Sequence, residues 1–201
     1  MPTLLVLLKR PAAGRVKTRL AASVGAEAAA ALYREWIGEV FANIQAVRGE
    51  IRVVGFYDGA APSDFEPWTS LADAWWQQPP GDLGHRLATG FSQVPENEPV
   101  AAIGTDCLEI TSSLVREAFE RLQNHYAVFG PTFDGGYYLV GAARRLPSFF
   151  SGVCWSSQDT LASHLATCRR NGYSHATLRT LRDIDTWEDL QLHYRERRRD
   201  R

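Results

Sequence analysis

Basic residues gather close to the start of the chain, where an apolar run ends. Lys9, Lys17 and Arg19 supply cationic side chains, and Pro11 and Gly14 lie between the two lysines. Lysine and arginine bind phosphate oxygens, while glycine lets a backbone approach a ligand closely. This composition favours a site for a nucleotide pyrophosphate. A solvated basic turn after an edge strand is the alternative interpretation.

Two common phosphate-binding fingerprints are absent from the sequence. The basic stretch lacks the G-x-x-x-x-G-K-[ST] spacing of a Walker A loop, and G-x-G-x-x-G occurs nowhere in the chain. Hydrolase chemistry is also disfavoured, because Ser112, Ser113 and Cys107 show no nucleophile elbow and no histidine lies in a recognisable partner motif. A phosphate site in this chain must therefore use another arrangement.

Carboxylates follow several of the expected strands. Asp58 and Asp106 come at the ends of apolar segments, Asp134 lies in an Asp-Gly-Gly turn, and Asp185 precedes the last helix. Residues 186–189 fit a helix capping box, which leaves Asp185 free to point into a site. An acid at the end of a strand is well placed to hold a metal ion. A tight hairpin alone is the alternative explanation of the Asp-Gly-Gly turn.

A glycine-rich turn opens another expected helix. Gly81 and Gly84 would let backbone amides approach a ligand, and Arg86 could reach a phosphate or a base. Asp82 is explained equally well as the N-terminal cap of the helix. The aromatic pair at 137–138, after the Asp-Gly-Gly turn, could form a wall that stacks on a sugar.

These side chains need a scaffold that brings strand ends together. The run at 4–8 is apolar throughout, which is typical of a strand buried on both faces of a parallel sheet. Ligands of such sheets bind beyond the carboxyl ends of the strands. Strands and helices alternate along the chain, which indicates an α/β fold. Further strands are expected at 51–57, 74–77, 100–104, 126–130, 137–141 and 176–181, and helices at 25–47, across 83–91, across 114–122, at 156–172 and after 183–185.

Composition indicates one ordinary globular domain, residues 1–201. The chain has 201 residues, 45% hydrophobic and 22% charged, which suffices for a substantial core. A formal net charge of −1 argues against a dedicated nucleic-acid binder. The apolar start is too short to span a bilayer and lacks the basic region of a signal peptide, so a cytoplasmic protein is expected. Three widely spaced cysteines favour reduced thiols.

Five stretches, taken together in this order, resemble one family and cover nearly the whole chain. They are Lys9-x-Pro11-x-x-Gly14-x-x-Lys17-Thr18-Arg19-Leu20, Gly81-Asp82-Leu83-Gly84-x-Arg86, Gly104-Thr105-Asp106-Cys107, Asp134-Gly135-Gly136-Tyr137-Tyr138-Leu139-Val140-Gly141 and Asp183-Ile184-Asp185-Thr186-x-Glu188-Asp189-Leu190. They resemble bacterial glycosyltransferase-A-like proteins, labelled nucleotide-diphospho-sugar transferases or arsenosugar-biosynthesis-type glycosyltransferases. The opening and closing stretches are also similar to those of phospholactate guanylyltransferase, molybdenum-cofactor guanylyltransferase and the sugar-acid cytidylyltransferases.

The resemblance implies a three-layer α/β/α Rossmann-like glycosyltransferase-A fold with a mixed, mainly parallel sheet. It also implies that Lys17 and Arg19 hold nucleotide phosphates. By the same resemblance Asp106 and Asp185 bind a divalent cation, Mg²⁺ or Mn²⁺, as hard oxygen ligands do. The expected sites are nucleotide-binding (Lys9, Pro11, Gly14, Lys17, Arg19, Asp58, Gly81, Asp82, Arg86), catalytic (Asp134, Lys17), acceptor-binding (Gly135, Gly136, Tyr137) and metal-binding (Asp106, Asp185).

Two transfer reactions fit these residues. The first is glycosyl transfer from a nucleotide diphosphate to a small acceptor, with Asp134 as the acceptor-side base. The alternative is nucleotidyl transfer from a nucleoside triphosphate, with release of pyrophosphate. A nucleotide-binding domain without catalysis is a third hypothesis. The expected partners are a nucleotide sugar or nucleoside triphosphate and a small-molecule acceptor, with no nucleic acid and no membrane span. A homodimer stays open, as do the donor base, the sugar and the stereochemistry of transfer.

Overall fold

The apolar run near the N-terminus forms an interior strand of the sheet, with neighbours on both sides. In the computed structural model, which describes residues 1–59 and 62–199, this strand is β1 (Thr3–Lys9). It pairs in parallel with β2 (Arg52–Asp58) on one side and with β4 (Val100–Ile103) on the other. The carboxyl ends of the three strands therefore meet at one edge of the sheet.

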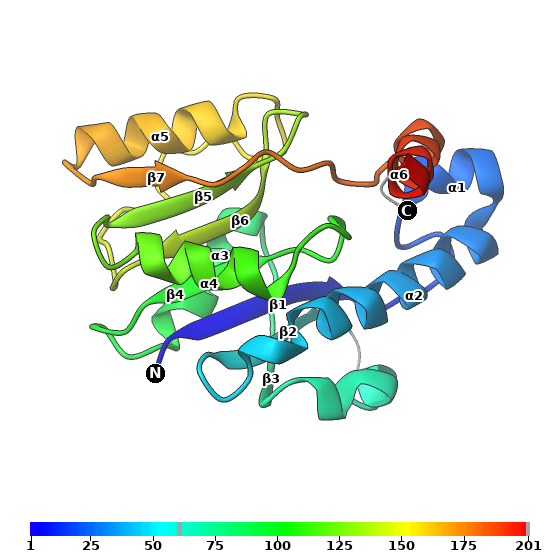
Figure 1. The fold of residues 1–201 in the computed structure, drawn as a ribbon, viewed down its shortest axis with the longest axis horizontal. Helices are drawn as coiled ribbons and strands as arrows, with labels where there is room; N and C mark the ends of the chain where they lie inside the picture. The colour runs from blue at the N-terminus through cyan, green and yellow to red at the C-terminus, as the bar shows by residue number, and fades with distance from the viewer. Residues whose placement is uncertain (60–61, 200–201) are drawn as a thin grey trace.

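The other half of the sheet contains an antiparallel strand. β6 (Tyr137–Ala142) runs antiparallel to both of its neighbours, β4 and β5 (Ala127–Pro131). β7 (His175–Thr177) pairs in parallel with β5, and β3 (Ala74–Gln77) pairs in parallel with β2. Within the described residues the strand order is β3-β2-β1-β4-β6-β5-β7 (Figure 1). The mixed, mainly parallel sheet expected from the sequence is confirmed.

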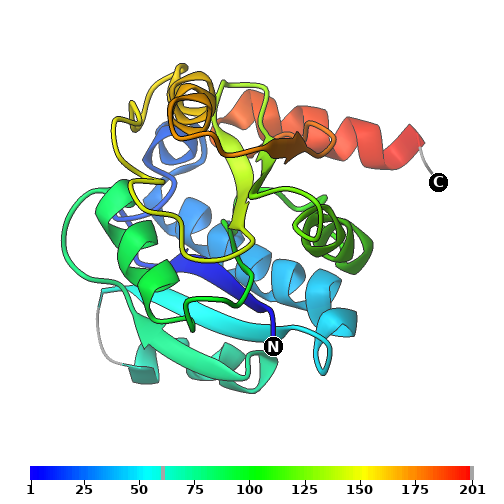
Figure 2. The same ribbon diagram turned by 90° about the vertical axis from the view of Figure 1, so that its left-hand side faces the viewer.

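Helices cover both faces of the sheet (Figures 1 and 2). α2 (Ala26–Ile44) and α4 (Ser112–Arg121) lie on one face, whereas α3 (Leu83–Ser92) and α5 (Thr160–Arg170) lie on the other. This arrangement confirms the three-layer α/β/α architecture. The remaining helical elements of the described residues are α1 (Thr18–Val24), α6 (Trp187–Arg199) and the 3₁₀ helices η1 (Gln45–Val47) and η2 (Pro62–Leu71).

Burial on both faces explains why β1 is hydrophobic along its length. Leu4, Val6 and Leu8 belong to the core cluster on the α2 and α4 side, whereas Leu5 belongs to the cluster on the α3 side. All four side chains are at most 1% exposed. Successive side chains of a strand point to opposite faces, so a strand covered on both sides needs apolar residues at every position. The loop after β1 therefore starts from a firmly packed strand end.

Several element boundaries differ from those expected. The basic stretch leads into a short helix, α1, that was not expected; the helix expected at 25–47 corresponds to α2. Gly25, with a φ of 90°, separates α1 from α2. Glycine adopts this backbone conformation without steric cost. The expected helix at 156–172 begins only at Thr160. The expected strand at 176–181 is shorter, because only its first residues pair with β5.

The three cysteines are free thiols within the described part of the chain. Cys107 and Cys168 are buried, and Cys154 is exposed. Burial raises the pKa of Cys107 and Cys168, so both thiols stay neutral. None of the helices in residues 1–59 and 62–199 combines the length and the hydropathy needed to cross a bilayer.

A histidine lies inside the apolar core on the α5 side of the sheet. The His164 side chain is fully buried, and its ring centre is 4.5 Å from that of Phe149 and 4.9 Å from that of Phe129. Burial lowers the pKa of His164 from 6.5 to about 4, because an imidazolium among aromatic rings would lose its hydration. The folded protein therefore resists a protonation that the unfolded chain accepts.

Acid should destabilise the protein through His164. Because the folded-state pKa is below the unfolded value, this contribution to stability is complete above pH 6.5 and declines as the pH falls towards 4. At pH 5 the loss should be about 2 kcal/mol. Urea unfolding at pH 7.5 and 5.0 measures this loss in the wild type, in His164→Met and in the partly exposed control His125→Gln. The control should behave as the wild type, whereas an undiminished pH dependence in His164→Met would contradict the prediction.

Candidate functional site

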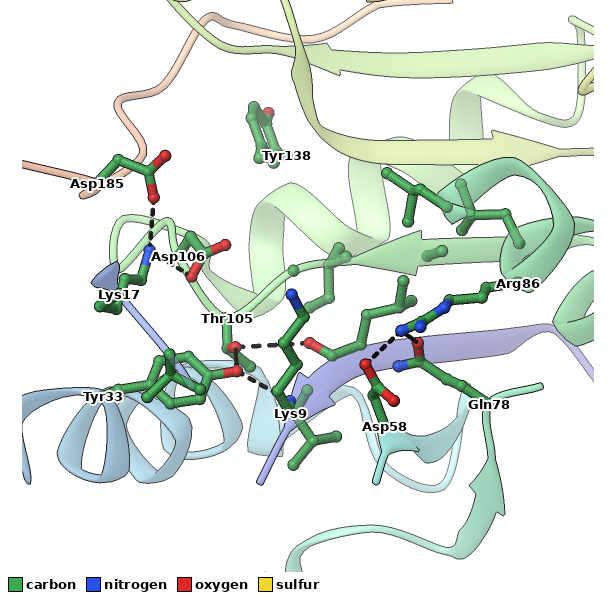
Figure 3. Close-up of a pocket in the computed structure, with 18 of the residues that line it drawn as sticks. Lys9, Lys17, Tyr33, Asp58, Gln78, Arg86, Thr105, Asp106, Tyr138 and Asp185 are labelled. Carbon is green, nitrogen blue, oxygen red and sulfur yellow. Dashed lines mark hydrogen bonds and ion pairs between the residues drawn. The ribbon is translucent and has the colours of Figure 1, made fainter. Parts of the chain in front are cut away.

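A cavity opens at the carboxyl ends of β1, β2 and β4. Its volume is about 850 Å³, within the usual range for small-molecule sites. Asp58 ends β2, and Asp106 follows β4. Figure 3 shows Lys17 and Asp185 at one end of this space and Arg86 at the other. The cavity therefore lies where ligands of open α/β sheets bind, and it is lined by charged side chains.

Lys17 joins two carboxylates that lie far apart in the sequence. Its Nζ is 2.7 Å from Asp106 Oδ1 and 3.0 Å from Asp185 Oδ1, and it donates a hydrogen bond to the carbonyl oxygen of Ile184 at 2.6 Å. The side chain of Lys17 is 5% exposed, whereas those of Asp106 and Asp185 are 46% and 43% exposed. The ammonium is thus buried behind two carboxylates that line the cavity.

Electrostatics keep the Lys17 ammonium charged. Burial alone would lower the pKa of Lys17, but its attraction to Asp106 and Asp185 and the hydrogen bonds with them raise the pKa above its ordinary value. Arg19 approaches the same group from solvent, with its Nη1 3.8 Å from Asp185 Oδ2 and its side chain 77% exposed. Such an exposed pair contributes little. Lys17 rather than Arg19 therefore holds the two carboxylates together.

α2 supports the floor of the cavity through Tyr33. The Tyr33 hydroxyl accepts a hydrogen bond from the backbone N–H of Lys9 at 3.0 Å and shares another with Thr105 Oγ1 at 2.9 Å. Burial raises the pKa of Tyr33 to about 12, so the hydroxyl stays protonated. These bonds tie the end of β1 to the residues after β4. The side chain of Lys9 extends from this point into the cavity (Figure 3).

A second polar network forms the opposite end of the cavity. Arg86 donates from Nη1 to Asp58 Oδ2 and, at 3.2 Å, to Gln78 Oε1. Its Nε donates to the carbonyl oxygen of Gly81 at 3.0 Å. Gln78 in turn donates from Nε2 to the backbone carbonyl of Phe56 at 2.6 Å. The guanidinium of Arg86 is thereby fixed between β2 and the start of α3, at the rim where the sequence predicts nucleotide contacts.

Most residues predicted to bind the nucleotide line the cavity, but Pro11, Gly14 and Asp82 do not. Gly14 has a φ of 73° and shapes the turn between Lys9 and Lys17. Asp82 accepts a hydrogen bond from the backbone N–H of residue 85 at 2.8 Å and is the N-cap of α3. The interpretation of Asp82 as a helix cap is therefore confirmed. The predicted residues that line the cavity are Lys9, Lys17, Arg19, Asp58, Gly81, Arg86, Asp106, Tyr137 and Asp185.

A smaller cavity of about 130 Å³ contains part of the predicted acceptor site. It is lined by Asp134, Gly136 and Tyr137 and also by Asp106, which lines the larger cavity too. Asp134 Oδ1 accepts hydrogen bonds from Thr132 Oγ1 at 2.5 Å and from the backbone N–H of Gly136 at 3.0 Å. The sequence left two interpretations of Asp134 open, a tight turn and a site residue near Asp106. Both apply, because Asp134 stabilises its own turn and lines the same cavity as Asp106.

Gly135 has a packing role in the same turn and lines neither cavity. Its φ is 90°, and a Cβ at this position would lie 2.0 Å from the carbonyl oxygen of Gln158. The carbonyl oxygen of Gly135 accepts a hydrogen bond from the backbone N–H of Leu161 at 3.0 Å. The turn is thus held against the start of α5, which explains why glycine is needed here.

The sequence interpretation misses several residues of the two cavities. Asp183 lines the smaller one, where burial and the nearby Asp134 raise its pKa to about 6. Asp183 alternates with Asp185 around the fully buried Ile184, a pattern that indicates two acids on the open side of an extended segment. Tyr33 carries no such signal, because it is one of many buried positions of an amphipathic helix. The other missed residues include Arg15, Gln78, Thr105 and Ser156.

Comparison with solved structures supports the fold assignment. A protein from Desulfovibrio desulfuricans G20, provisionally assigned as a nucleotide-diphospho-sugar transferase, is 30% identical and has a TM-score of 0.88. The match covers 97% of this chain and 87% of that protein. The fold is therefore that of the nucleotide-diphospho-sugar transferases. A search of proteins with curated descriptions finds no match.

Two more distant structures share the fold. A nucleotidyl transferase from Methanothermobacter thermautotrophicus is 14% identical, with a TM-score of 0.68 over 100% of this chain and 99% of that one. A CMP:2-keto-3-deoxy-manno-octonic acid synthetase complexed with CTP is 11% identical, with a TM-score of 0.60 over 100% of this chain and 99% of that one. At such low identities the likeness concerns the arrangement of strands and helices alone.

A family model matches residues 40–157, which is more than half of the chain. The matched range extends from the C-terminal part of α2 to the segment before α5 and includes Asp58, Arg86, Asp106 and Asp134. The chain therefore belongs to the family described as uncharacterized protein conserved in bacteria (DUF2064).

Proposed function

We propose that this protein is a metal-dependent glycosyltransferase that moves a sugar from a nucleotide diphosphate to a small acceptor. The observation that carries the proposal is the convergence of Asp106 and Asp185 at the carboxyl edge of the sheet. Both carboxylates are nearly half exposed and line a cavity large enough for a nucleotide sugar. The similarity to the Desulfovibrio protein, at 30% identity over almost the whole chain, supports the same class of reaction.

The donor set suits Mg²⁺ or Mn²⁺, with Asp106 and Asp185 as the residues that would hold it. Among the described residues no group of three or more His, Cys, Asp or Glu side chains is arranged to hold a metal. Two carboxylates nevertheless suffice for magnesium, because substrate phosphates and water complete its coordination. The second oxygen of each carboxylate is turned away from Lys17 (Figure 3). When bound, such a cation neutralises charge that develops on the departing diphosphate.

Other side chains of the cavity would position the donor. Lys9, Arg15 and Arg19 line it and supply cations for phosphate oxygens. Asp58 and Arg86 lie at the end opposite the carboxylate pair (Figure 3). A carboxylate and a guanidinium can respectively accept from and donate to the polar edge of a nucleoside. The donor would thus lie with its nucleoside near Arg86 and its diphosphate near Asp106.

The acceptor would lie in the smaller cavity. The two cavities share Gly104, Asp106, Tyr137 and Tyr138 as lining residues, so an acceptor there would be next to the sugar–phosphate bond. Both hydrogen bonds that the Asp134 side chain accepts from the described residues end on Oδ1. Its Oδ2 is therefore left to take the proton of an attacking hydroxyl, the role of a general base.

Nucleotidyl transfer is the second candidate, and the cationic lining of the cavity favours it. Lys9, Arg15 and Arg19 together match the higher negative charge of a nucleoside triphosphate. A nucleotidyl transferase and a CTP-bound synthetase have the same fold, so the scaffold is compatible with this reaction. In this reaction an acceptor oxygen would form a bond to the α-phosphorus, and pyrophosphate would leave.

The released product should identify the reaction. We expect the protein, supplied with Mn²⁺, a panel of nucleotide sugars and small hydroxyl acceptors, to release a nucleoside diphosphate detectable by mass spectrometry. Pyrophosphate released from a nucleoside triphosphate in the presence of phosphorylated or acidic acceptors would support nucleotidyl transfer instead. If no donor is consumed while nucleotides raise the melting temperature, the protein is a binding domain without catalysis.

Asp106→Asn should lower kcat at least about 100-fold, because an amide cannot supply the carboxylate charge on which the metal site depends. The matched control is Asp82→Asn, which lies outside the cavity and keeps a side chain that caps helices well. Its turnover should stay within about twofold of the wild type. Circular dichroism and melting temperatures check that both variants fold. Full turnover in a folded Asp106→Asn variant would exclude the proposed metal role.

A further inference from the structure

Lys17 has no N–H left for a phosphate. A lysine ammonium carries three donors, and three oxygens surround its Nζ: Asp106 Oδ1 at 2.7 Å, Asp185 Oδ1 at 3.0 Å and the Ile184 carbonyl oxygen at 2.6 Å. The side chain is also 5% exposed. Direct phosphate contact, which the resemblance implies for Lys17, would require these bonds to break. The arrangement assigns Lys17 to the two aspartates instead.

The backbone of Lys17 is held in an uncommon conformation. Its φ of 48° and ψ of 47° lie in the left-handed region, which residues other than glycine adopt rarely and mainly where the surroundings hold them there. Lys17 occupies the N-cap position of α1, where its ammonium, which has donors only, cannot accept the backbone N–H groups at the start of the helix. The side chain is thus directed to the carboxylates rather than to the end of its own helix.

The two oxygens of each carboxylate have different surroundings. Lys17 binds Oδ1 of both Asp106 and Asp185. Oδ2 of Asp185 lies 3.8 Å from the exposed Arg19, and among the described residues no hydrogen bond ends on Oδ2 of Asp106. Figure 3 shows both outer oxygens turned away from the ammonium. Each carboxylate is therefore oriented through one oxygen while the other is left for a ligand.

Lys17 also changes the charge of the pair. Two carboxylates carry a formal charge of −2, and the ammonium reduces the sum to −1. A divalent cation that binds without a diphosphate is then attracted less strongly by the pair. It also finds only two carboxylate oxygens that Lys17 does not bind, Oδ2 of Asp106 and Oδ2 of Asp185. A cation that arrives with a diphosphate gains phosphate oxygens as further ligands, and the phosphates gain the cations Lys9 and Arg19.

We propose that Lys17 is a positioning residue that suppresses binding of the free divalent cation and makes cation binding depend on the diphosphate. The inference rests on the proposed metal site at Asp106 and Asp185. The Lys17 ammonium binds Oδ1 of both aspartates and thereby orients their Oδ2 atoms. It also neutralises part of the negative charge of the two carboxylates. The protein would thus take up the cation together with its donor rather than before it.

Electron paramagnetic resonance of Mn²⁺, titrated with and without inorganic pyrophosphate, tests the proposal without an activity assay. The wild type should bind Mn²⁺ at least tenfold more tightly with pyrophosphate than without it. Lys17→Met should bind Mn²⁺ alone at least tenfold more tightly than the wild type and should gain less from pyrophosphate. Arg121→Met is the matched control, because this exposed arginine at the end of α4 lines neither cavity, and its affinity for Mn²⁺ alone should change less than about twofold.

The outcomes separate this inference from the proposed function. If the wild type binds Mn²⁺ with pyrophosphate but Lys17→Met binds Mn²⁺ alone no more tightly than the wild type, the inference fails and the metal site stands. If the wild type and Lys17→Met bind no Mn²⁺ under either condition, the metal site fails as well. Lys17→Gln, which keeps hydrogen-bond donors without the charge, is measured in parallel in case Lys17→Met does not fold. If Lys17→Gln then binds Mn²⁺ alone with the same affinity as the wild type, the inference is overturned.

Discussion

The contact of Lys17 with Asp106 and Asp185 is the interaction on which the site depends. It joins the loop after β1, the end of β4 and the segment before α6. A backbone hydrogen bond from the N–H of Ile184 to the carbonyl oxygen of Asp106, at 2.9 Å, joins two of these segments again. A buried ammonium is stable only when its lost hydration is replaced by partners of opposite charge. The position of each segment therefore depends on the other two.

The sheet topology explains why this contact forms between β1 and β4. The chain passes from β1 to β2 and β3 in one direction and then returns to place β4 on the other side of β1. The strand order reverses between β1 and β4, and such a point leaves a crevice beyond the strand ends. Lys17 lies in the connection that leaves β1, and Asp106 lies in the connection that leaves β4. Both side chains thus enter the crevice from neighbouring strands.

The sheet could be predicted from the sequence more fully than the site. The apolar run of β1 requires burial on both faces whatever surrounds it, and the strand ends then place Asp58 and Asp106 at one edge. The placement of Lys17 could not be predicted, because it depends on the unforeseen α1 and on a left-handed backbone at residue 17. Residue type and spacing indicate only a cation near phosphate. Asp183 could have been predicted, since its alternation with Asp185 is visible in the sequence.

The surroundings of Nζ explain why a lysine suits this position. Three oxygens lie within 3.0 Å of one nitrogen, and a compact ammonium with three rotatable donors can satisfy all of them. A guanidinium is planar and presents its donors in a rigid fork, so arginine would not fit the same three acceptors. The raised pKa of Lys17 keeps it charged throughout the physiological pH range. Oδ1 of Asp106 and Oδ1 of Asp185 therefore stay bonded to Lys17 over this pH range. The Oδ2 atoms are left to bind whatever ligand enters the cavity.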